Sequence, residues 1–256
     1  MKIVVSKDAK ALGCNAADYI AGLINEAIAK KGEARIILST GASQLTTIEP
    51  LIERDIDWSK VTMFHLDEYV DLPETHIASF RKYLKERFIQ KINLKAAHLV
   101  DGTPEGIAAL TAELRSAPID VGLIGIGENA HIAFNDPPAD FDTKEAYIVV
   151  NLNDTCKNQQ VGEGWFATIN DVPKQAVSMT VYQILQCKQI VSIVPYGVKA
   201  DAVAGCLHNE VTNLIPATIM KGHDDFNLFV DEDSYAKVDE AKIVKVNGKD
   251  YTIERK

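Results

Sequence analysis

Short apolar runs alternate with longer amphipathic stretches along the 256 residues of the chain. Several of these runs are uniformly apolar rather than alternating, which is typical of strands that are covered on both faces. Strands of this kind form the interior of layered α/β folds. The runs that we predict as strands cover residues 3–5, 35–38, 61–66, 120–125, 147–150, 177–181, 190–194 and 227–230.

The stretches between the runs have helical periodicity. In residues 8–31, for example, Leu12, Ala16 and Ile20 fall on one stripe. Further helices are predicted over residues 79–89, 104–115 and 198–207. This alternation of strands and helices predicts the fold class α/β, as a three-layer αβα sandwich around a mostly parallel, Rossmann-like sheet.

No internal repeat and no linker rich in proline, glycine or serine divides the chain, so we expect a single domain over residues 1–256. The C-terminal part has a different pattern. Residues 241–246 and 250–254 flank Asn247-Gly248, a pair that favours a tight turn with positive φ at both positions. We therefore predict a C-terminal β-hairpin.

Composition and charge narrow the classes of function. Hydrophobic residues make up 46% of the chain, which is incompatible with a disordered protein. The formal net charge of −9 argues against a nucleic-acid partner, but a small phosphorylated ligand needs only a local positive site. Four scattered cysteines and an N-terminus without a leader predict reduced thiols in a cytoplasmic protein. No apolar run approaches the roughly 20 residues of a membrane span, so no membrane partner is expected.

In open parallel sheets, ligands bind beyond the carboxyl ends of the strands, so the residues after each run carry the candidate chemistry. Thr40, Gly41, Ala42 and Ser43 follow the second run and precede a helical stretch. Small residues and free N–H groups at the start of a helix bind anions. The alternative is an ordinary helix start in which Ser43 is the N-cap.

Two adjacent acids, Asp67 and Glu68, follow the third run. Adjacent strand residues point to opposite faces, so only one of the two can face a given pocket. Partial burial would raise the pKa of such a carboxylate toward the range useful for a general base. The alternatives are a solvated acid at the start of a loop, a turn cap, or a metal ligand together with His65, although that spacing matches no specific metal motif.

A histidine, His131, lies in the densest group of small and polar residues. Histidine is the side chain best suited to moving protons near neutral pH, and Asp136 five residues later is placed to fix its tautomer. The alternative is a structural histidine in a tight turn. Lys199 falls in the first turn of a predicted helix, where a lysine opposes the helix dipole unless it binds an anion; the alternative is a solvated surface lysine. Together these residues predict a site for an anionic small molecule, without cofactor or metal.

The same residues resemble the motifs of the glucosamine-6-phosphate deaminase (isomerase) family, which shares its fold with the 6-phosphogluconolactonases. The resemblance runs in order from about Met1 to Ser234. The sequence Ala-Phe-Asn after the histidine is typical of the deaminases and differs from the Ala-Ser-Leu-Phe-Pro of the lactonases. The motifs are Ser39-Thr40-Gly41, Leu66-Asp67-Glu68-Tyr69-Val70, His131-Ile132-Ala133-Phe134-Asn135 and Val172-Pro173-Lys174.

This resemblance implies conversion of glucosamine 6-phosphate to fructose 6-phosphate and ammonia without a cofactor. It implies Asp67 as the base that takes the C2 proton. It also implies His131, supported by Asp136 and Asn129, as the group that moves the proton in ring opening. Residues 40–43 and Lys199 would hold the phosphate. Galactosamine 6-phosphate as the substrate, a lactonase-like hydrolase and a non-catalytic sugar-phosphate binding protein are the alternatives.

Several positions depart from the family pattern and indicate a divergent branch. Asn129 and Ala130 stand where an aspartate and a glycine are usual, and Asp136 stands where a glutamate is usual. If position 130 requires positive φ, alanine is strained there by about 1–2 kcal/mol. The family often places an arginine near Cys156 for the phosphate, and Lys157 is the candidate replacement, with the charge but without bidentate geometry. The sequence leaves open whether the chain forms a homo-oligomer.

Overall fold

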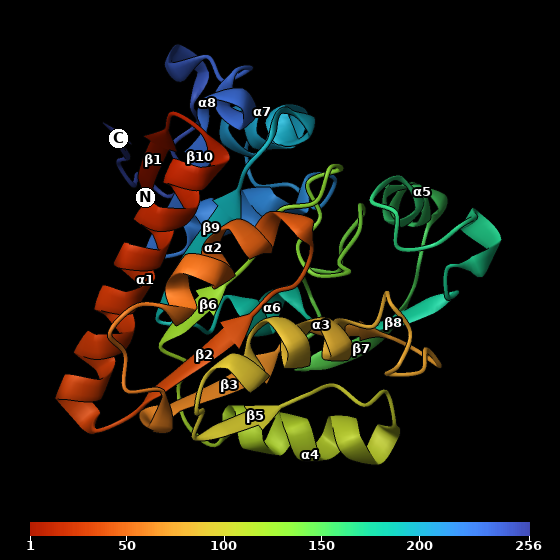
Figure 1. Ribbon diagram of the computed structural model, residues 1–256. Coiled ribbons are helices and arrows are strands. Elements are labelled where there is room, and N and C mark those ends of the chain that lie inside the picture. Colours follow the sequence, from red (N-terminus) through yellow and green to blue (C-terminus); the bar gives the residue numbers. More distant parts are fainter.

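A parallel sheet forms the centre of the structure. The computed structural model describes residues 1–256, and its main sheet has eight parallel strands in the order β11-β1-β10-β9-β6-β2-β3-β5 (Figure 1). Six of the predicted runs lie in this sheet, which confirms the α/β class. The strands are β1 (Lys2–Ser6), β2 (Ala34–Leu38), β3 (Val61–His65), β5 (Ala96–His98), β6 (Val121–Leu123), β9 (Gln189–Val194), β10 (Phe226–Asp231) and β11 (Thr252–Arg255).

Helices cover both faces of this sheet (Figure 1). Alternate residues of β2 belong to different cores: Ile36 and Leu38 pack in one core with α1 and α2, and Ile37 packs in the other with α4 and α7. The predicted three-layer sandwich is therefore confirmed. No helix is long and apolar enough to cross a membrane. The helices are α1 (Ala9–Lys31), α2 (Ala42–Ile52), α3 (Phe80–Arg87), α4 (Pro104–Arg115), α5 (Asp154–Gly162), α6 (Val181–Ile184), α7 (Ala200–His208) and α8 (Glu232–Tyr235).

A second, antiparallel sheet has three strands, β4 (Asp67–Tyr69), β8 (Gln175–Met179) and β7 (Tyr147–Asn151). The prediction that residues 147–150 and 177–181 join the parallel sheet is wrong. One face of β7 is partly solvated, which suits an antiparallel sheet and not a strand covered on both sides. The hydrophobic pattern also missed β5, because this edge strand has only three half-buried residues.

The predicted C-terminal hairpin is wrong in its first strand and in its pairing, and right in its turn and in the presence of its second strand. Asn247 and Gly248 have φ values of 54° and 69°, and the N–H of Lys249 donates to the carbonyl of Val246 at 3.0 Å. Before the turn, Ile243 and Val246 are buried and form no strand. β11 pairs in parallel with β1 instead. The edge of β1 offers backbone partners within a large sheet, whereas an isolated two-stranded ribbon is only marginally stable.

Helices α1 and α2 pack closely against each other, and this contact fixes the position of α2 relative to α1. α1 starts at Asp8, whose carboxylate accepts a hydrogen bond from the N–H of Ala11 at 2.8 Å. A Cβ at Gly13 would lie 1.8 Å from the carbonyl oxygen of Thr46 in α2. Only glycine fits this contact, so the two helices pack backbone to backbone. This contact holds the N-terminus of α2 at the carboxyl end of β2.

We expect Gly13→Ala to lower the free energy of unfolding by about 1–3 kcal/mol, because one of the two backbones must move. Gly22→Ala is the matched control in the same helix. No atom lies within 4 Å of its added Cβ, so we expect a gain of about 0.5–1 kcal/mol from helix propensity. Urea unfolding measures both values, and equal stabilities of the two variants would contradict the close contact.

Candidate active site

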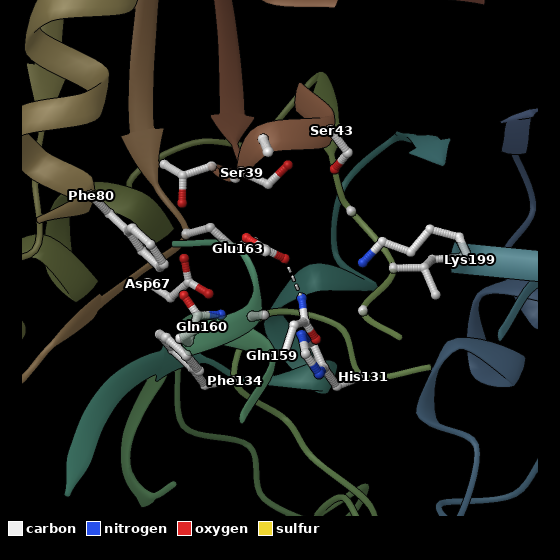
Figure 2. Close-up of a pocket in the computed structure, with 18 residues that line it drawn as sticks. Ser39, Ser43, Asp67, Phe80, His131, Phe134, Gln159, Gln160, Glu163 and Lys199 are labelled. Carbon is white, nitrogen blue, oxygen red and sulfur yellow. Dashed lines mark hydrogen bonds between the residues drawn. The ribbon is translucent and has the colours of Figure 1, made fainter. Parts of the chain in front are cut away.

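A pocket opens at the carboxyl ends of β2, β3 and β6, where a parallel sheet binds its ligands (Figure 2). Its walls come from the β2–α2 loop, the start of β4, the loop after β6, helix α5 and the segment before α7. Asn129 and Asp136 do not line the pocket but contact His131, and Lys157 does neither. The predicted site residues that line it are Thr40, Gly41, Ala42, Ser43, Asp67, His131 and Lys199.

Free backbone donors lie at one end of the pocket, in the β2–α2 loop. The N-cap of α2 is Gly41, with a φ of 112°, and no side chain caps the helix. The alternative role of Ser43 as N-cap is therefore wrong. The N–H groups of Ala42 and Ser43 donate to no carbonyl of the protein. Such groups at the start of an 11-residue helix form a site for an anion.

Lys199 reaches into the pocket on the side of Ser43 (Figure 2). It is only 6% exposed, and its ammonium group forms neither a salt bridge nor a hydrogen bond. Burial lowers the pKa of this lysine, and the carboxylates of Glu163 and Glu128 partly offset the shift. A buried ammonium without a partner is costly unless a ligand neutralises it. Lys199 is therefore not a solvated surface lysine, and its geometry suits an anion.

A buried carboxyl group, that of Asp67, faces the pocket and makes no hydrogen bond within the protein (Figure 2). Burial raises the pKa of Asp67 to about 8, and the adjacent charge of Glu68 adds to the shift. This position confirms the predicted rise in pKa. It also overturns the alternatives of a solvated acid and a turn cap. A carboxyl group with a pKa near neutrality is suited to taking and returning protons.

The neighbouring acid, Glu68, points the other way and has a structural role. Its side chain is fully buried and accepts five hydrogen bonds, which tie β4 to the start of α3. Only one of the two adjacent acids faces the pocket, as the alternation of strand residues requires. The donors to Glu68 are the N–H groups of Tyr69, Phe80 and Arg81, the hydroxyl of Ser79 and Nε of Arg81.

His65 does not share the pocket with Asp67. It is fully buried, its Nδ1 accepts a hydrogen bond from the N–H of Val100 at 3.3 Å, and burial lowers its pKa to about 3. Since it does not line the pocket, His65 does not combine with Asp67 as a metal ligand. No group of three or more His, Cys, Asp or Glu side chains has an arrangement that could hold a metal ion.

The imidazole of His131 is held by two polar side chains. Its Nδ1 lies 2.6 Å from Oδ1 of Asn129 and 3.2 Å from Oδ1 of Asp136. Nδ2 of Asn129 donates to the same oxygen of Asp136 at 3.0 Å. Burial of Asp136 raises its pKa, but its hydrogen bonds with His131 and Asn129 outweigh burial, and the net shift is downward. Because both neighbours of Nδ1 accept, the proton sits on Nδ1, and Nε2 is left as an acceptor.

Backbone geometry around His131 is tight and strained. Ala130 has a φ of 64° in the left-handed region, where the penalty for alanine is about 1–2 kcal/mol. The conditional prediction of strain at this position is thereby confirmed. A Cβ at Gly127 would lie 2.2 Å from Cε1 of His131, so the imidazole rests directly on the glycine backbone. In the loop after β6, the strained Ala130 and the glycine at position 127, which has no room for a side chain, therefore fix the position of the His131 ring.

Helix α5 and its C-cap residue contribute pocket residues for which the sequence predicted no role. Gln159, Gln160 and Glu163 line the pocket, whereas Lys157 lies on another face of the helix. The prediction of Lys157 as the phosphate ligand finds no support in this geometry. Oε1 of Glu163 accepts from Nε2 of Gln159 at 2.7 Å, and its Oε2 accepts from the indole of Trp165 at 3.0 Å (Figure 2). Only the i, i+4 spacing of residues 159 and 163 could have indicated a shared face.

Comparison with known proteins places the chain in a family. A sequence profile described as "Glucosamine-6-phosphate isomerases/6-phosphogluconolactonase" matches residues 7–228. The glucosamine-6-phosphate deaminase of Streptococcus uberis is 32% identical over 221 residues, which cover 85% of this chain and 92% of that protein. The enzyme of the same name from Lactobacillus delbrueckii subsp. bulgaricus is 30% identical over 236 residues, or 91% of this chain and 97% of that protein.

Solved structures agree with the sequence comparison. A monomeric glucosamine-6-phosphate deaminase superposes with a TM-score of 0.85 at 27% identity, over 93% of this chain and all of that one. The 6-phosphogluconolactonase of Trypanosoma brucei superposes with a TM-score of 0.76 at 17% identity, over 93% of this chain and 98% of that one, which shows a shared fold alone. With its profile match over most of its length and relatives above 30% identity, the chain belongs to the family of glucosamine-6-phosphate isomerases and 6-phosphogluconolactonases.

Proposed function

We propose that the protein is a deaminase that isomerises an amino-sugar 6-phosphate, first of all glucosamine 6-phosphate, to the ketose 6-phosphate and ammonia. The observation that carries the proposal is the presence, in one pocket, of an unbonded, buried carboxyl group at Asp67 and an anion site formed by α2 and Lys199. Relatives that bear the name glucosamine-6-phosphate deaminase support the choice of substrate.

Substrate binding begins at the phosphate. The free N–H groups at the start of α2 lie in the same wall of the pocket as Thr40 and Ser43. Ser43 and Lys199 lie on the same side of the pocket (Figure 2). Binding a phosphate there would neutralise the lysine. Because the phosphate is remote from the reacting carbons, its binding energy can be used to orient C1 and C2 of the sugar.

Ring opening comes next, since the C2 proton is only weakly acidic until C1 is an open-chain carbonyl. Nε2 of His131 takes the proton of the C1 hydroxyl and returns it to the ring oxygen as the C1–O5 bond breaks. Asn129 and Asp136 keep the proton of the resting imidazole on Nδ1, so Nε2 is free to act as the base.

Isomerisation and deamination follow from one proton abstraction. Asp67 takes the C2 proton, the C–H electron pair forms the C1–C2 double bond, and the carbonyl electron pair moves to O1, which is then protonated. The C2 ammonium loses a proton to give an enamine, and addition of a proton to C1 then gives a protonated imine at C2. Addition of water to this imine releases ammonia and leaves the ketose phosphate. Every step is a proton transfer or an addition of water, so the proposal requires no cofactor.

Two alternatives are less well supported. The lactonases among the structural neighbours are below 25% identity and share the fold alone. A purely binding protein would not need a carboxyl group whose pKa burial raises to about 8 in the same pocket as an oriented imidazole. Galactosamine 6-phosphate differs from glucosamine 6-phosphate by one hydroxyl epimer and is the second substrate to test.

We expect Asp67→Asn to lower ammonia release from glucosamine 6-phosphate by at least about 1,000-fold, because the amide cannot accept the C2 proton. Binding of the sugar phosphate, measured by thermal shift, should remain. The assay runs without added metal, with galactosamine 6-phosphate as the parallel substrate. Full activity of the variant would show that another group is the base, and ligand binding by the wild type without ammonia from either sugar would favour the binding protein.

The pH dependence of kcat/KM reports the same carboxyl group in the free enzyme. Because burial raises the pKa of Asp67 to about 8, we expect kcat/KM to rise about tenfold per pH unit below that value and to level off above it. The positive amino group of a bound substrate favours the carboxylate, so the corresponding limb of kcat should lie at lower pH. Limbs of kcat and kcat/KM at the same pH would contradict this coupling.

Stability should show the opposite trend. The folded-state pKa of Asp67 lies far above its unfolded value of about 3.9, so the folded state binds this proton more tightly. The contribution of Asp67 to the free energy of unfolding is therefore fully present below about pH 4 and is lost as the pH rises through about 8. Asp67→Asn cannot ionise, and we expect it to be more stable than the wild type by about 5 kcal/mol at pH 8.5. Urea unfolding at pH 5 and 8.5 measures the gain, and a gain independent of pH would refute the raised pKa.

A further inference from the structure

Gln160 presents a fixed hydrogen-bond donor to the pocket. The residue lines the pocket and is only 5% exposed. Its Oε1 accepts a hydrogen bond from the hydroxyl of Tyr69 at 2.7 Å, and its Nε2 donates to no group of the protein. The amide oxygen is thus occupied and the two N–H donors are available. A buried amide with free donors is complementary to an oxygen of a ligand.

The orientation of this amide is built into the core. Tyr69 is 1% exposed, and its ring packs against Phe80, Phe134 and Phe166 with centroids 5.0, 5.3 and 5.5 Å away. These rings hold the tyrosine hydroxyl in one place, and the hydroxyl in turn holds the oxygen end of the Gln160 amide. A polar group fixed before the ligand arrives needs no reorganisation during the reaction.

Gln160 lies at the reacting end of the pocket and not at the anion site. Tyr69 and Asp67 are two residues apart in β4, so their side chains project from the same face of the strand. Gln160 bonds to Tyr69 on this face and lines the same pocket as Asp67, and in Figure 2 Gln160 and Asp67 lie on one side of the pocket and Lys199 on the other. The amide therefore adjoins the carbon from which the proposed base takes a proton.

We propose that Gln160 is a catalytic residue whose amide N–H donates to the C1 carbonyl oxygen of the open-chain substrate. This inference rests on the proposed function. As Asp67 takes the C2 proton, the C–H electron pair forms the C1–C2 double bond and the carbonyl electron pair moves to O1. The Gln160 amide donates to this oxygen while its negative charge develops. The C2 ammonium is itself a donor and cannot pair with Nε2, which leaves oxygen as the partner.

The contact has a kinetic signature. A donor to an oxygen that gains charge only in the transition state affects kcat, whereas a donor to an unreactive hydroxyl affects ground-state binding. Removal of one such donor costs on the order of 100-fold in kcat. The reduced analogue 2-amino-2-deoxyglucitol 6-phosphate has no carbonyl group. Its affinity therefore separates the two kinds of contact.

The experiment compares Gln160→Met, Tyr69→Phe and the control Asn158→Met, an exposed position of α5 outside the pocket. We expect Gln160→Met to lower kcat about 100-fold, with KM and analogue affinity within about threefold of wild type. Tyr69→Phe keeps the amide but releases its orientation, so we expect a loss of about three- to tenfold in kcat only. Asn158→Met should match the wild type. Circular dichroism and thermal unfolding verify that each variant is folded.

Other outcomes overturn the inference. Wild-type kcat in Gln160→Met would exclude the contact, and an unchanged kcat with weakened analogue binding would assign Gln160 to a hydroxyl. If Gln160→Met does not fold, Tyr69→Phe decides: wild-type kcat in that variant contradicts the fixed donor. Absence of ammonia release from the wild type would instead defeat the proposed function, so the two failures are distinguishable.

Discussion

The buried carboxylate of Glu68 determines the direction in which Asp67 points. It accepts five hydrogen bonds, four of them from residues 79–81, and these tie β4 to the start of α3. Loss of this network would leave a buried charge without partners, so β4 has a single stable register. The same face of β4 that carries Asp67 also carries Tyr69, which positions Gln160. One structural carboxylate thus orients the proposed base and a neighbouring donor.

Three unfavourable local features lie in the pocket or directly beside it. Asp67 is a buried carboxyl group without a hydrogen bond, Lys199 is a buried ammonium without a counter-ion, and Ala130 has left-handed backbone geometry. Each of these features lowers the stability of the free protein. A phosphorylated, amine-bearing ligand offsets the first two through its own charges. Such a distribution of strain is typical of functional sites.

The departures from the family pattern at positions 129, 130 and 136 lie around the imidazole of His131. Asn129 bridges His131 and Asp136, so a neutral amide transmits the orienting effect of the carboxylate. Asp136, although one methylene shorter than glutamate, still lies 3.2 Å from Nδ1. Two glutamines of α5 and Glu163 at its C-cap line the wall near which the family often places a phosphate-binding arginine. In this chain the cation that faces the pocket is therefore Lys199, from another part of the sequence.

The sequence by itself determined the αβα layering, the approximate extents of α1, α3, α4 and α7, and the places of Asp67, His131, Lys199 and the loop at 40–43 at the ends of strands. Uniformly apolar runs and helical stripes are local signals, and residues at the ends of parallel strands converge by topology. Tertiary structure alone decided which sheet β7 and β8 join, where β11 pairs and which face of α5 lines the pocket. These outcomes depend on which segments, far apart in the sequence, pair with the same strand edge or cover the same apolar surface. A local sequence pattern contains no information on those pairings.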